Sequence, residues 1–233
     1  VLQQLPDNQS ADVLSGHTSI EDASMIKMEN GQVLLQSVDQ LKAFTNDVWL
    51  FAKIATNHCL SDIYAMGANP HSALAVVGLP FATKKYAKSQ LKELMLACSE
   101  TLQENDCELI GGHSAESSEL HFGLCVNGFI EEEKILSKGG LREGDSLILT
   151  KPLGTGTIFA ADMRHLAKGP WVSEGLAQMT KSNGDAVKIA KNFTIHACTD
   201  ITGFGLAGHC LEMTRSGVGI ELWLSKVPVM NGA

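Results

Sequence analysis

The sequence predicts a mixed fold of helices and strands, α+β or α/β, from three observations. Short apolar runs typical of buried strands alternate with longer amphipathic segments typical of helices. An Asn-Gly pair at 30–31 separates two apolar runs, which indicates a β-hairpin. Two glycine-containing turns, at 153–156 and 202–205, each lead into a helical pattern. The 233 residues suffice for one large domain or two small ones.

The first half of the chain is predicted to contain a hairpin, two helices and further strands. The hairpin joins SMIKM, 24–28, to QVLLQSVD, 32–39. The first helix covers 47–66 and stops at Gly67, and its N-cap is Thr45, Asn46 or Asp47. The remaining elements are, in order, a buried strand at 72–79, an amphipathic helix at 85–105, and strands at 107–112 and 121–130 that flank an irregular loop at 112–120.

A shift in composition marks the expected domain boundary. EEEKILSKGGLREGD, 131–145, is charged and contains glycine, so we expect an N-terminal domain at 1–138 and a partial C-terminal domain at 139–233. The last predicted strand ends close to the end of the chain, which we interpret as an unfinished domain. The second part is expected to contain, in order, a strand at 146–150, a helix within 153–167, a helix at 172–192, a strand at 195–200, a helix within 202–217 and a strand at 218–224.

Charge and hydropathy argue against two classes of partner. Lys plus Arg is 18 and Asp plus Glu is 26, which gives a formal charge of −8 without any basic block, so no nucleic acid is expected. No apolar run approaches the length that crosses a bilayer, so no membrane partner is expected. The six cysteines form no C-x-x-C pair, which favours free thiols in the reducing cytoplasm and argues against a zinc site, and with it against a zinc hydrolase.

Four aspartates lie at the ends of predicted elements, namely Asp22, Asp39, Asp62 and Asp200. Each alone is explained by a turn, by a cap or by pairing with a lysine. Together they offer the hard oxygen ligands that suit magnesium, which usually keeps waters and adds substrate phosphates. The metal would then supply the positive charge that lets an acidic protein hold an anionic substrate. The pattern therefore predicts a magnesium-nucleotide site, with purely structural acids as the alternative.

The helix that carries Asp62 has an unusual polar surface. In NHCLSDIYAMG, 57–67, Asn57 with Ser61 and His58 with Asp62 are i,i+4 pairs, which places polar groups on one side of an otherwise apolar helix. A carboxylate in that setting needs a cation, a metal or several donors. The spacing alone leaves both a metal-binding role and a structural role open for Asp62.

Two glycine-containing segments are candidates for binding phosphate. LIGGHS, 109–114, ends an apolar strand with paired glycines whose N–H groups can approach a phosphate closely, although a tight turn explains them equally well. CTDITGFG, 198–205, places Asp200 before a helix N-terminus, where anions bind, although capping by Thr202 and Asp200 is the alternative. KPLGTGT, 151–157, lacks the spacing of a Walker A loop.

Four motifs together resemble the selenophosphate synthetase (selenide, water dikinase) family. They are NHCLSDIYAMGANP, LIGGHSAESSEL, LILTKPLGTGTIFAADM and HACTDITGFGLAGHCLEM, in the order and spacing of the family. The similarity runs from about residue 19 onward, and the first motif with AKGPW is most similar to a form that follows a pyridine-nucleotide-disulfide-oxidoreductase-like domain on one polypeptide. The resemblance implies an α+β, two-domain aminoimidazole ribonucleotide synthetase-like fold, with the second domain incomplete in this chain.

The resemblance also implies an activity and its participants. Enzymes of this family convert ATP, selenide and water into selenophosphate, orthophosphate and AMP. ATP as substrate and Mg²⁺ as cofactor would lie between the two domains, and the N-terminal domains of a homodimer would build a joint β-barrel. Such metal-assisted phosphoryl transfer rests on positioning and charge neutralisation.

Individual residues take roles from the same resemblance. Asp22, Asp62 and Asp200 would be the magnesium ligands. Gly112, His113 and Ser114 would reach the nucleotide from the neighbouring subunit. The full set of expected nucleotide-binding residues is Ser19, Ile20, Glu21, Asp39, Asp62, Gly112, His113 and Ser114.

The chain also departs from the family pattern. The family's Cys or selenocysteine and a nearby Lys lie in a glycine-rich segment that would precede Val1, so no catalytic side chain is expected here. Glu21 replaces the first acid of an Asp-Asp pair. We therefore expect a fragment of a longer enzyme that folds and dimerises without turnover. Two alternatives stay open: another ATP-using synthetase or kinase of the same superfamily, and a non-catalytic nucleotide-binding dimerisation module that serves an oxidoreductase.

Overall fold

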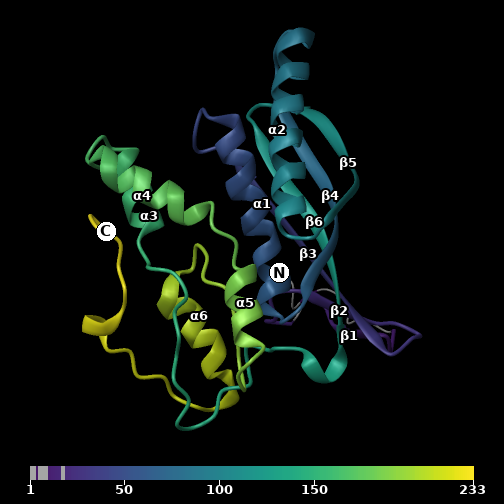
Figure 1. The fold of residues 1–233 in the computed structure, drawn as a ribbon, viewed down its shortest axis with the longest axis vertical. Helices are drawn as coiled ribbons and strands as arrows, with labels where there is room; N and C mark the ends of the chain where they lie inside the picture. Colours follow the sequence, from purple (N-terminus) through teal and green to yellow (C-terminus); the bar gives the residue numbers. More distant parts are fainter. Residues whose placement is uncertain (1–3, 5–9, 17–18) are drawn as a thin grey trace.

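The first half of the chain forms a six-stranded sheet with two helices on one of its faces (Figure 1). The computed structural model describes Gln4, residues 10–16 and residues 19–233. The strands lie in the spatial order β1-β2-β3-β6-β4-β5. Their bounds are β1 Val13–Ser15, β2 Ser24–Lys27, β3 Gln32–Lys42, β4 Asn69–Pro80, β5 Glu108–Ser117 and β6 His121–Glu131.

Two long helices, α1 (Val48–Ala65) and α2 (Lys84–Glu104), pack on this sheet and confirm the two helices predicted for the first half. The Asp47 carboxylate caps α1 by accepting a hydrogen bond from the Leu50 N–H at 2.9 Å. Gly67 follows the helix with a φ of +83°, a conformation that glycine adopts without strain. The core between helices and sheet is apolar, and its fully buried members include Val33, Leu35, Phe51, Leu60, Ile63, Leu94, Phe122 and Leu124.

The predicted hairpin is confirmed, but the predicted loop at 112–120 is wrong. β5 continues to Ser117 and pairs in parallel with β4, while β6 begins at His121. The two strands approach so closely at Gly112 that a Cβ there would lie 2.2 Å from the Ala75 carbonyl oxygen. The paired glycines therefore permit close strand packing here, where the sequence suggested that they end the strand.

The second half contains four α-helices among its described residues, and none of its three predicted strands forms. The helices are α3 Thr155–Asp162, α4 Gly169–Met179, α5 Gly184–Ala190 and α6 Gly205–Met213. The predicted helix at 172–192 is interrupted between α4 and α5. Residues 146–150, 195–200 and 218–224 lack strand structure, because a strand requires a neighbour for its backbone hydrogen bonds and the described chain offers these segments none. Only an isolated bridge between Leu153 and Val229 is formed in this half of the described chain.

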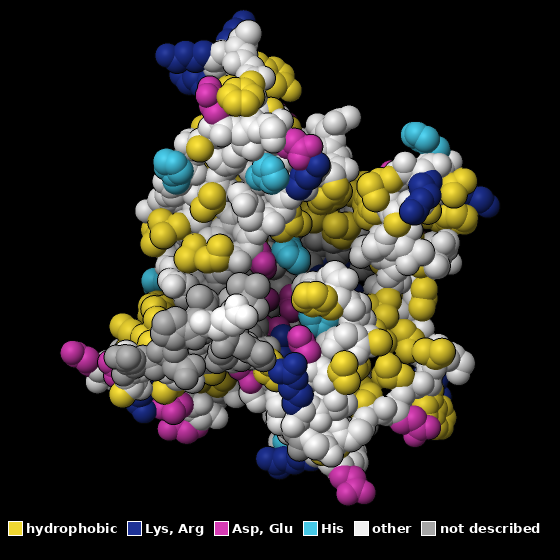
Figure 2. Space-filling view, turned by 180° about the vertical axis from the view of Figure 1, so that it is seen from behind, with side chains coloured by type: hydrophobic (Ala, Val, Ile, Leu, Met, Phe, Trp, Pro, Cys, Tyr) yellow, Lys and Arg dark blue, Asp and Glu magenta, His cyan; other side chains and the backbone are white. Residues whose placement is uncertain are grey.

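No described helix or strand packs on the face of the sheet that turns away from α1 and α2, and Figure 2 shows apolar side chains on this side of the described chain. Val38 and Ile110 are 66% and 60% exposed there. Other large apolar side chains of this face are Leu74, Val76 and Phe129. Separately, no helix in the described part of the chain combines the length and the apolar character that spanning a bilayer requires.

Candidate functional site

An acidic cavity of about 200 Å³ lies where the two halves of the chain meet. Figure 2 shows acidic and histidine side chains gathered in the hollow at the middle of that view. Six carboxylates line the cavity, and Lys138 is the one lysine or arginine among its described lining residues. The lining residues are Glu21, Asp22, Asp39, His58, Asp62, Lys138, Asp200, Thr202, Phe204, His209 and Glu212.

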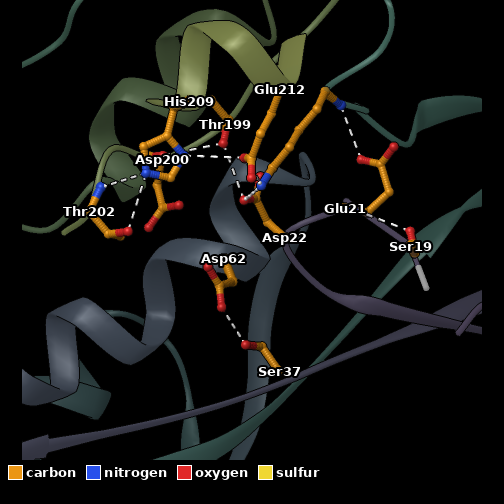
Figure 3. Close-up of polar contacts among 11 residues, drawn as sticks. Ser19, Glu21, Asp22, Ser37, Asp62, Thr199, Asp200, Thr202, His209 and Glu212 are labelled. Carbon is orange, nitrogen blue, oxygen red and sulfur yellow. Dashed lines mark hydrogen bonds and ion pairs between the residues drawn. The ribbon is translucent and has the colours of Figure 1, made fainter. Parts of the chain in front are cut away.

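Three of the predicted aspartates converge in this cavity. Asp22 precedes β2, Asp62 lies in the last turn of α1, and Asp200 precedes α6 (Figure 3). One carboxylate oxygen of each lies within 4.8 Å of those of the other two. Three oxygens at this separation can coordinate one or two divalent cations in common. The fourth predicted aspartate, Asp39 on β3, lines the same cavity and lies 3.7 Å from Nε2 of His58.

Burial raises the pKa of all three carboxylates above the ordinary value of 3.8, and the charges of neighbouring acids add to the rise. Burial raises the pKa of Asp62 to about 8, and the charge of Asp200 adds to that rise. Burial raises the pKa of Asp200 to about 7, with further contributions from Asp22 and Asp39. Burial raises the pKa of Asp22 to about 6, although its hydrogen bond with Lys138 opposes the change. The cavity is therefore short of positive charge, as a site for a divalent cation is before the ion binds.

The two oxygens of Asp22 have different surroundings. Its side chain is 4% exposed, and Oδ1 lies 2.7 Å from Nζ of Lys138 and accepts a hydrogen bond from the Thr199 hydroxyl at 3.2 Å. Oδ2 is buried without a hydrogen-bond partner among the described atoms. A buried carboxylate oxygen without a donor is costly, so this atom is suited to accept a cation.

Lys138 connects both halves of the chain, and sequence reasoning placed it in a charged linker. Its ammonium lies between Asp22 and Oε2 of Glu212, at 2.7 and 3.0 Å, with only 7% of its side chain exposed. Its backbone N–H donates to Oε2 of Glu21 at 3.0 Å. The only sequence signal for this lysine is the general one that buried acids need a cation.

The loop that follows Asp200 is held by a histidine that sequence reasoning also missed. Nε2 of His209 accepts a hydrogen bond from the Thr202 N–H at 3.1 Å and lies 3.2 Å from the Thr202 hydroxyl oxygen (Figure 3). Nδ1 of the same ring lies 3.6 Å from Oε2 of Glu212. Burial lowers the pKa of His209, which favours the neutral ring.

The polar side chains of α1 form two groups, one that lines the cavity and one that contacts the second half of the chain. His58 and Asp62 line the cavity, as their i,i+4 spacing allows. Asn57 donates a hydrogen bond to the Thr180 carbonyl at 3.0 Å, and the Ser61 hydroxyl accepts one from Asn183 at 2.8 Å. The polar groups of this helix thus face two directions, and half of them hold the segment between α4 and α5.

The other predicted nucleotide contacts lie in two places. Ser19, Ile20 and Glu21 form the segment beside Asp22, where the Ser19 hydroxyl accepts a hydrogen bond from the Glu21 N–H at 3.2 Å. Gly112, His113 and Ser114 lie on the edge strand β5 and do not line the acidic cavity. His113 instead lines a second hollow of about 320 Å³, together with Glu116, Ser117 and His121 among others.

Comparisons with known proteins agree with the fold and the motifs. The model for AIR synthase related protein, N-terminal domain, matches residues 20–130, and the model for its C-terminal domain matches residues 142–233. The selenide, water dikinase of Pelobacter propionicus is 40% identical over 217 residues, which are 93% of this chain and 62% of that protein. The selenide, water dikinase of Nitratidesulfovibrio vulgaris is 38% identical over 241 residues, which are 100% of this chain and 67% of that protein.

A solved structure shares the fold at lower sequence identity. AaThiL complexed with AMPPCP and TMP has a TM-score of 0.77 and 22% identity, over 91% of this chain and 69% of that chain. At this identity the likeness concerns the fold alone. This chain spans 62% to 67% of the length of the two curated relatives above.

Proposed function

The chain belongs to the AIR synthase-related family, in its selenide, water dikinase group, and from this premise we propose that it serves the ATP-dependent synthesis of selenophosphate. ATP, selenide and water would give selenophosphate, orthophosphate and AMP. The observation that carries the proposal is the convergence of Asp22, Asp62 and Asp200 in one acidic cavity. A polyphosphate binds among carboxylates when cations lie between them, and the cavity has the acids for this arrangement.

Asp22, Asp62 and Asp200 would hold Mg²⁺ in this proposal. The set of donors consists of hard oxygens, the unpartnered Oδ2 of Asp22 is available, and the raised pKa values indicate missing positive charge. Bound magnesium would neutralise phosphate oxygens during phosphoryl transfer. Lys138 and Thr199 orient Asp22 through Oδ1, and the Ser37 hydroxyl donates to Oδ2 of Asp62, so the chain itself fixes the direction of two ligands.

The nucleotide would lie beside this cavity. Ser19, Ile20 and Glu21 are adjacent to Asp22 in sequence, and Asp39 lines the cavity, which supports a role for these residues in binding ATP. A nucleotide analogue in the structurally similar AaThiL supports the same substrate class. The segment Gly112–Ser114 lies on the outer strand of the sheet, where a second subunit would have access to it.

A homodimer would form through the face of the sheet that no described helix or strand covers. Val38, Leu74, Val76, Ile110 and Phe129 are exposed apolar side chains of this face that a second copy could bury. The same arrangement would bring the β5 segment of one subunit toward the nucleotide of the other. We also propose that the two matched family regions are separate domains that meet near residue 138.

The whole reaction requires more than the residues described above. The relatives are longer than this chain, and the expected Cys and Lys, the delivery of selenide and a fused oxidoreductase-like domain remain predictions from the family resemblance. The six free cysteines fit a protein that works in the reducing cytoplasm.

Calorimetry and product analysis test this proposal. Calorimetric titration of the chain with ATP should show binding that requires Mg²⁺, and D200N should abolish it, whereas D185N changes an exposed aspartate and should not. An ATP affinity that is the same with and without Mg²⁺ would contradict the metal-bridged site. Phosphorus NMR of a longer form of the protein with ATP and selenide should show selenophosphate, orthophosphate and AMP. A different phosphorylated product would instead indicate another enzyme of the superfamily.

A further inference from the structure

His209 occupies a buried position from which it contacts the loop after Asp200 and a carboxylate of α6. Its side chain is 5% exposed. Nε2 lies 3.1 Å from the Thr202 nitrogen, and Nδ1 lies 3.6 Å from Oε2 of Glu212. Phe204 packs near the same ring, with 6.0 Å between ring centroids. The ring therefore lies between the start of the loop and the body of α6.

The geometry determines which ring nitrogen carries the proton. A backbone N–H can only donate, so Nε2 of His209 must be the acceptor for Thr202. In the neutral ring the proton is then on Nδ1, the atom that faces Glu212. Nδ1 has no partner within hydrogen-bond distance among the described atoms, and Oε2 of Glu212, at 3.6 Å, is the carboxylate oxygen that it faces.

Glu212 continues this connection to the opposite side of the cavity. Its Oε2 accepts a hydrogen bond from Nζ of Lys138 at 3.0 Å, and the same ammonium lies 2.7 Å from Oδ1 of Asp22. The connected groups are Thr202, His209, Glu212, Lys138 and Asp22. All of them except Lys138 are labelled in Figure 3. The series begins at Thr202, two residues after Asp200, and ends at Asp22, so it connects the loop that follows one converging aspartate with another of the three.

We propose that His209 is a positioning residue that fixes the loop carrying Asp200 relative to Asp22, through its Nε2 acceptor and its Nδ1–H toward Glu212. This inference rests on the proposed function, because it concerns ligands of the proposed metal. Partners that orient metal ligands are typically worth 10- to 100-fold in metal affinity, by order of magnitude. Without Nε2, the Thr202 N–H loses its acceptor, and the loop with Asp200 gains alternative conformations.

Two substitutions of His209 distinguish a role in positioning the loop from a role in packing alone. H209F keeps a ring of similar volume and removes the acceptor, so we expect it to weaken Mn²⁺ binding, measured by electron paramagnetic resonance, by roughly 10- to 100-fold. H209Q places a carbonyl oxygen near the position of Nε2, so it should restore most of the affinity. H196F is the matched control, because His196 also pairs with a carboxylate, Asp145 at 2.8 Å, but lies outside the acidic cavity.

Two measurements that do not involve metal complete the test. Nitrogen NMR of histidine-labelled protein should show His209 protonated on Nδ1 and not on Nε2. Hydrogen exchange of the Thr202 amide should be slow in the wild type and in H209Q, and fast in H209F. Equal Mn²⁺ affinity in wild type and H209F, or a proton on Nε2, would overturn the inference and leave the proposed function intact. Failure of the wild type to bind Mn²⁺ would instead refute the proposed function, while the tautomer and the Thr202 exchange rate would still test the positioning of the loop.

Discussion

Replacing Asp62 with Asn should make the metal-free chain more stable at about pH 8 while removing its response to Mg²⁺. Burial and the charge of Asp200 raise the pKa of Asp62 from 3.8 to about 8. The folded state therefore holds this proton more tightly than the unfolded state does, so Asp62 lowers stability progressively as pH rises from about 4 to about 8. One pKa unit corresponds to about 1.4 kcal/mol, so four units set an upper limit of about 5–6 kcal/mol, and relaxation of the site should reduce the gain to about 2 kcal/mol.

Urea unfolding of wild type and D62N in EDTA, across this pH range, measures the effect. The two proteins should differ little near pH 4, where the folded state keeps Asp62 protonated and the unfolded state is only about half ionised, and the advantage of D62N should grow toward about pH 8. With Mg²⁺ at about 100 times its dissociation constant the wild type should gain about 2.7 kcal/mol, and D62N should gain little. D185N is the matched control, because Asp185 is 91% exposed. A D62N protein that is less stable than the wild type in EDTA at about pH 8 would refute the electrostatic reasoning.

Three further predictions follow from the same structure. K138M should destabilise the chain by about 3–5 kcal/mol in urea unfolding, because it leaves the buried Asp22 carboxylate without its cation. The control K188M, at a 63% exposed site, should change the free energy of unfolding by no more than about 0.5 kcal/mol. Equal effects of the two substitutions would contradict a stabilising role of the buried Lys138–Asp22 pair. Calorimetric affinity for Mg²⁺ should rise as pH increases from about 6 to about 8, since protons on the three aspartates compete with the ion, and a flat profile would contradict the raised pKa values. V38E should weaken self-association in sedimentation experiments by about tenfold or more, because dimerisation would bury unpaired carboxylates, and an unchanged dimer would exclude this face of the sheet.

The sequence predicts those elements whose signals are local. Helix α1 begins after Asp47 and ends before Gly67, because a capping carboxylate and a glycine with positive φ act within a few residues of the helix ends. The hairpin around Asn30-Gly31 is predicted for the same reason. Prediction from the sequence fails where a strand depends on a partner that is distant in the chain. The residues after Gly112 form a strand because β4 lies beside them. Residues 146–150 form none because no described strand lies beside them.

The residues of the candidate site also differ in how far the sequence alone indicates them. Asp22, Asp62 and Asp200 are noticed in the sequence as acids at element ends, and the family resemblance assigns them a common role. Lys138 and His209 give no comparable signal. One partner of Lys138 in the cavity, Asp22, lies more than 100 residues away, and a lysine beside glycines is ordinary in a linker. Only the folded chain shows that these side chains are buried against carboxylates.

In the proposed function, the wide separation of Asp22, Asp62 and Asp200 along the chain would determine when a cation can bind during synthesis. Asp22 and Asp62 leave the ribosome long before Asp200, and N-terminal units generally fold first. A nascent chain that ends before the loop preceding α6 therefore offers an ion two of its three carboxylates. In the proposed site, strong retention of a divalent ion would then report that both halves of the polypeptide have matured and joined.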